Sequence, residues 1–107
     1  MHKSIMKILN KLFSSRHNEA ADKLAEEFIS KCPLDVIGNL DKKKNKIKYN
    51  GALNHLYSDA KDYARNNKLN MYAKAKIGNR FMWNLKEYGY DEALVEKLTT
   101  DVLKILG

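Results

Sequence analysis

Apolar residues recur along most of the chain at spacings of three and four, the period of an amphipathic helix. The first such segment covers residues 1–13, and its apolar positions are Ile5, Ile8, Leu9, Leu12 and Phe13. Lysines occupy the other side of this segment. We therefore expect a short basic amphipathic helix that packs its apolar stripe on the rest of the domain. Binding to an anionic membrane surface is the alternative.

A second helix is predicted from about Arg16 to Lys31, with Ser14 and Ser15 as candidate N-caps. Its inner stripe consists of Ala21, Leu24, Ala25, Phe28, Ile29 and Cys32. Its acidic residues are expected to face outward, and they are Glu19, Asp22, Glu26 and Glu27. Pro33 ends this helix because the residue before a proline is pushed away from helical geometry. The same proline then opens a short helix that stops at Gly38-Asn39.

Residues 40–50 form the most polar and most basic stretch of the chain. Ile47 and Tyr49 alternate with lysines, as in a strand, but no alternating segment follows the turn signal Asn50-Gly51. We therefore expect a basic surface loop in which Asn50 caps the next helix. That helix is predicted over residues 51–67, and its apolar stripe is Leu53, Leu56, Tyr57, Ala60, Tyr63 and Ala64.

Two further helices are predicted, over residues 69–88 and 91–106. Gly78 lies inside the first, where a glycine costs about 1 kcal/mol relative to alanine, and this indicates close approach of another helix. Gly89 suits the left-handed residue that follows a helix, and Asp91 suits the N-cap of the last helix. The inward-facing residues are Ala73, Ile77, Phe81, Leu85 and Tyr88, then Leu94, Val95, Leu98, Val102 and Ile105.

These patterns predict an all-α fold, with residues 1–107 forming a single domain and a compact bundle of about five helices, four main and one short. A hydrophobic share of 44% over 107 residues is enough to form a core. Five glycines and one proline are too few for a turn-rich all-β fold. The single cysteine excludes an internal disulfide, and no apolar run reaches the roughly 20 residues that cross a bilayer.

The net charge of +7 is concentrated in the middle of the chain. Residues 40–86 carry +9, whereas residues 1–39 carry +1 and residues 87–107 carry −3. Such a field steers anionic partners toward one surface. Only three of the twenty basic residues are arginine, the side chain that binds phosphate in bidentate fashion, so an acidic protein fits at least as well as nucleic acid. Ordinary solubilising charge is the alternative interpretation.

Motifs for catalysis are missing from the sequence, which contains no glycine-rich phosphate loop, GxSxG, HExxH or paired cysteines. Cys32 lies on an inner stripe and is expected to be a small buried apolar residue. His55 and Asp59 are four apart on one helix, but a zinc site needs three or four ligands, so a solvated pair is expected. The adjacent Glu26 and Glu27 diverge on their helix. We therefore expect a protein that is not an enzyme and uses neither cofactor nor metal; an enzyme would have to use Cys32, His55 and Asp59.

The predicted partner-binding surface consists of Lys42, Lys43, Lys44, Lys46, Lys48, Tyr49, Lys61, Arg65 and Lys68. We expect a small non-catalytic bacterial protein, of the inhibitor, immunity or adaptor kind, that docks on an acidic partner protein through this surface. The alternative is a DNA- or RNA-binding protein in which the same lysines neutralise phosphates and tyrosine stacks on bases. The lone thiol and the lack of an export signal predict a cytoplasmic location.

Overall fold

The computed structural model describes the backbone of residues 2–107 and the side chains of residues 16–107. This part of the chain forms five helices and no strand. The helices are α1 (His2–Lys31), α2 (Leu34–Ile37), α3 (Lys43–Asn66), α4 (Met71–Tyr88) and α5 (Glu92–Leu106). The prediction of an all-α bundle with four main helices and one short one is thus confirmed.

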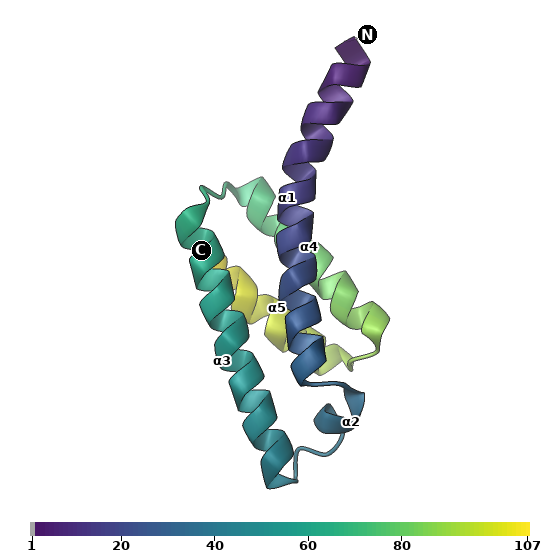
Figure 1. The fold of residues 1–107 in the computed structure, drawn as a ribbon, viewed down its shortest axis with the longest axis vertical. Helices are drawn as coiled ribbons and strands as arrows, with labels where there is room; N and C mark the ends of the chain where they lie inside the picture. Colours follow the sequence, from purple (N-terminus) through teal and green to yellow (C-terminus); the bar gives the residue numbers. More distant parts are fainter. Residues whose placement is uncertain (1) are drawn as a thin grey trace.

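The four long helices enclose one apolar core (Figure 1). Helix α1 packs against α3 and α4, and α5 packs against the same two helices, while the short α2 packs on α3. The largest fully buried side chains are Phe28, Phe81, Ile77, Leu85, Leu98, Val95, Val102 and Cys32. All of them belong to the predicted inner stripes, because a helix in a small bundle is stable only when its apolar face is covered.

The two helices predicted before Pro33 are a single helix, α1. Ser14 and Ser15 lie inside it and are not N-caps. The segment has no glycine or proline that would stop a helix, and continuing the helix keeps the backbone hydrogen bonds that a break would lose. The N-terminal turns of α1 extend beyond the other helices (Figure 1). The predicted packing of the 1–13 apolar stripe concerns side chains outside the described residues.

The prediction of a basic loop over residues 40–50 is wrong, because α3 begins at Lys43. Asn50 is therefore an interior helical residue and not a cap. Lysine is a good helix former, and Asn45 and Tyr49 extend the inner stripe of α3 by two turns. Asn45 is buried, and its side-chain amide donates to the carbonyl of Asn39 at 3.0 Å, which satisfies it inside the α2–α3 turn.

The connection between α4 and α5 follows the predictions closely. Gly89 has a φ of 115°, the left-handed region that favours glycine. The carboxylate of Asp91 accepts from the backbone N–H of Leu94 at 2.8 Å, as expected for an N-cap. A Cβ added to Gly78 would lie 2.5 Å from Cδ2 of Leu103, so the predicted close approach is made by α5.

No helix among the described residues combines the length and the apolar character needed to cross a bilayer.

Candidate functional site

The basic end of α3, which we define as Lys42, Lys43, Lys44, Lys46 and Lys48, surrounds the first turns of that helix. All five side chains are exposed, and no acidic side chain of the described residues forms an ion pair with them. The first turn contains no acidic residue, and the N-cap residue makes no side-chain capping hydrogen bond. Since the N-terminus of a helix is already its positive end, lysines here oppose the helix dipole and strengthen the local positive field.

A groove lies beside this basic end, between the end of α1, α2 and α3. Its volume is about 590 Å³, and its lining residues include Pro33, Val36 and Ala52. Lys31 of α1 and Lys48 of α3 also line it. Lys44 lies one helical turn before Lys48 on the same face of α3. Asp35 and His55 line it as well, so the groove combines apolar residues with charged side chains of both signs.

The rest of the predicted surface is not continuous with the basic end. Lys61, Arg65 and Lys68 are exposed, but they lie at the other end of α3 and in the loop after it. With a rise of about 1.5 Å per residue, Lys48 and Lys61 are separated by about 20 Å along the helix axis. Arg65 also has Asp62 at 4.0 Å. The structure divides the predicted surface into two separate basic regions.

Tyr49 belongs to the core edge rather than to the exposed surface. Its ring meets Phe28 edge to face, with centroids 6.3 Å apart, and burial raises its pKa. Tyr57 and Tyr63 also make hydrogen bonds to other helices of the bundle. The Tyr57 hydroxyl donates to Asp101 at 2.5 Å, and the Tyr63 hydroxyl is hydrogen bonded to His17 at 2.7 Å. All three rings are only partly exposed.

Two exposed aromatic rings lie on α4, outside the predicted partner-binding surface. Tyr72 is 72% exposed and Trp83 is 50% exposed. The Lys76 ammonium lies 5.8 Å from the Tyr72 ring centroid, and the Lys86 ammonium lies 5.2 Å from the Trp83 ring centroid. A lysine side chain four or three residues away is a common neighbour on a helix surface, so spacing could have indicated both pairs.

Cys32 is buried, as predicted. Burial raises the pKa of its thiol, which keeps it in the unreactive protonated form near neutral pH. The hydroxyl of Tyr90 donates to the Cys32 carbonyl at 2.5 Å and so closes the end of α1. This environment is structural rather than nucleophilic.

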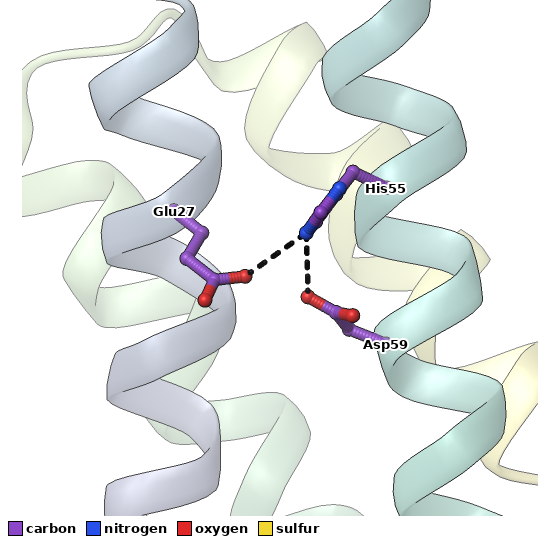
Figure 2. A group of neighbouring side chains, drawn as sticks. All are labelled: Glu27, His55 and Asp59. Atoms are coloured by element: carbon purple, nitrogen blue, oxygen red, sulfur yellow. Dashed lines mark ion pairs between the residues drawn. The ribbon is translucent and has the colours of Figure 1, made fainter.

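His55 and Asp59 form the predicted pair, and the structure adds Glu27 from α1 to it (Figure 2). The Nε2 atom of His55 lies 3.4 Å from Asp59 and 3.7 Å from Glu27, and each distance is measured to a carboxylate oxygen. The nearby Asp59 carboxyl, and to a lesser degree burial, raises the pKa of Glu27. One Glu27 oxygen, Oε2, is buried and has no hydrogen-bond partner.

Two of the acidic residues expected to face outward therefore face other helices. Glu27 points to α3, and Asp22 accepts two hydrogen bonds from Arg80 of α4, at 2.8 and 3.1 Å. The Arg80 guanidinium lowers the pKa of Asp22. Both positions border the inner stripe of α1, where a polar side chain can reach a neighbouring helix. The sequence carries no local signal that selects these partners.

Comparison of the chain with protein-family models, with curated proteins and with solved structures found no match.

Proposed function

We propose that the protein is a non-catalytic binding protein, of the inhibitor, immunity or adaptor kind, and that the basic end of α3 docks on an acidic partner protein. The observation that carries this proposal is the set of five exposed lysines without an ion pair among the described residues. Lysines at the positive end of a helix oppose its stability. A partner with carboxylates at its surface would remove this repulsion on binding.

The groove beside the basic end supports the same proposal. Carboxylates of a partner can pair with Lys31 and Lys48, while an apolar side chain contacts Pro33, the partly exposed apolar residue of the lining. An interface with an apolar centre and a charged rim is the usual arrangement in protein–protein complexes. Phosphate binding would need no apolar contact of this kind.

A charge-neutralised variant tests the proposal. Lys42, Lys43, Lys44, Lys46 and Lys48 are replaced together by glutamine, and binding of a fluorescent oligoglutamate peptide is measured by anisotropy at low ionic strength. We expect binding to weaken by about tenfold or more, since a steering field of this kind changes encounter by that order. The matched control replaces Lys61, Arg65 and Lys68 by glutamine and is expected to retain most of the affinity.

Equal loss in both variants would contradict a localised docking surface. The five-lysine variant should fold at least as well as the unaltered protein, because it removes charges that oppose the helix dipole. A thermal melt therefore separates lost binding from lost folding. Tighter binding to a single-stranded oligonucleotide than to oligoglutamate would favour the alternative function.

That alternative, nucleic-acid binding, is favoured by one observation on α4. Tyr72 and Trp83 are exposed, and each has a lysine ammonium near its ring. Exposed aromatic rings beside cations are what single-strand binding proteins use to stack bases and neutralise phosphates. Under this alternative, replacing both rings by alanine weakens oligonucleotide binding and leaves oligoglutamate binding unchanged.

A further inference from the structure

We propose that Glu27, His55 and Asp59 form a binding site for a divalent transition-metal ion of the zinc class, held between α1 and α3. Each residue offers one ligand atom, and these atoms lie within 4.8 Å of one another. Figure 2 shows the three side chains converging from the two helices.

The spacing of the ligand atoms fits a metal polyhedron better than direct hydrogen bonds. Zinc binds nitrogen and oxygen ligands at about 2.0–2.2 Å, so two ligands of a tetrahedral site lie about 3.3 Å from each other. The Nε2 atom of His55 is 3.4 Å from the Asp59 oxygen and 3.7 Å from the Glu27 oxygen. Both separations are close to a tetrahedral edge, and the longer one exceeds the hydrogen-bond range.

One atom of the cluster lacks a hydrogen-bond partner. The Oε2 atom of Glu27 is the oxygen that faces His55, and it is buried without a hydrogen-bond partner. A buried carboxylate oxygen without a partner is unfavourable. A divalent cation between the two carboxylates and the imidazole would supply the partner that this oxygen lacks.

The ligand set also selects the kind of ion. One imidazole nitrogen with two carboxylate oxygens suits zinc and related transition metals, whereas magnesium and calcium prefer oxygen ligands alone. A hollow of about 310 Å³ adjoins the three residues and is lined further by Asp62 and Asn66. This space leaves room for water as a fourth ligand.

The direct test is a titration of the full-length chain with zinc chloride after treatment with a chelator, followed by calorimetry and by a thermal melt. We expect one zinc ion per chain and a higher melting temperature, since an ion that binds only the folded state stabilises it. In His55→Ala and Glu27→Gln, affinity should fall by at least about tenfold and the thermal shift should shrink accordingly. Magnesium chloride should produce no comparable shift.

The matched control is Glu26→Gln, which removes an exposed carboxylate next to Glu27 and should leave zinc affinity unchanged. No zinc binding by the unaltered chain, or zinc affinity that is equal in His55→Ala, would overturn the proposal. The five-lysine variant should bind zinc normally, and Glu27→Gln, at a residue that does not line the groove beside the basic end, should bind oligoglutamate normally. Failure of the metal site is thereby distinguished from failure of the docking surface.

Discussion

The interface between α4 and α5 and the interface between α1 and α3 differ in the polar side chains that they contain. At the α4–α5 interface, Gly78 lets Leu103 approach closely, and Ile77 and Phe81 of α4 and Leu98 of α5 are fully buried in the core. At the α1–α3 interface, two carboxylates and an imidazole meet next to a hollow of about 310 Å³. Close apolar packing contributes to stability, whereas polar side chains that meet beside a hollow can bind a ligand.

The largest expected effect belongs to the apolar side of this comparison. Phe81→Ala removes a fully buried ring of α4, and we expect the free energy of unfolding to fall by about 3–5 kcal/mol. Urea unfolding followed by circular dichroism measures this change. Trp83→Ala, on the exposed face of the same helix, is the control and should cost about 1 kcal/mol or less. Equal losses in the two variants would show that Phe81 is not central to the core.

A smaller effect is expected where the turn between α4 and α5 meets the end of α1. Tyr90→Phe removes the hydroxyl that donates to the Cys32 carbonyl and leaves the buried ring in place. The carbonyl then loses its donor, and stability should fall by about 1–2 kcal/mol in the same urea assay. Tyr72→Phe, at a ring that is 72% exposed, should change nothing measurable.

The ion pair between α1 and α4 makes the free energy of unfolding depend on pH. Arg80 lowers the pKa of Asp22 in the folded state, so the unfolded state binds protons more readily. This contribution is present above the ordinary pKa of an aspartate and is lost as the pH falls through the lowered value. Asp22→Asn should therefore flatten the loss of stability on acidification, measured by urea unfolding between neutral pH and about pH 3. An unchanged slope would contradict the assigned role of the pair.

The smallest change in stability is expected at the α1–α3 interface, and there the substitution should stabilise the protein. The pKa of Glu27 is raised in the folded state, so its ionisation reduces stability as the pH rises through that value. Glu27→Gln removes this penalty, and the chelator-treated variant should be slightly more stable than the unaltered protein at neutral pH. The difference should shrink as the pH is lowered. A variant that is less stable at neutral pH would show that Glu27 supports the interface without metal.

Local signals predicted well where neighbours in the sequence decide the structure. Gly89 and Asp91 were predictable because a left-handed residue and an N-cap act on the backbone a few residues away. The start of α3 was not predictable in this way. Most residues between positions 40 and 50 are charged or polar, and the inner stripe of α3 continues among them through Asn45 and Tyr49. Once α3 packs in the bundle, the burial of Tyr49 offsets the repulsion among the lysines, and the hydrogen bond from Asn45 to the Asn39 carbonyl compensates for burying the amide.

The candidate sites were predictable only in part, and for a related reason. Sequence spacing identified His55 with Asp59 because both lie on one helix, but it gave no sign that Glu27 would complete the cluster from another. It also joined Lys48 and Lys61 into one surface, although the length of α3 separates them. Distances along a helix follow from the chain, whereas contacts between helices depend on how they are rotated against each other.

The periodicity of apolar residues by itself determined that this chain is helical and which faces form its core, because both depend on spacings of three and four. Its charge pattern determined that the middle of the chain is basic. The tertiary structure decided that α1 lies between α3 and α4 and brings Glu27 to His55. It also left the five lysines at the start of α3 without acidic partners among the described residues. Those outcomes depend on packing between distant segments, which a local pattern does not encode.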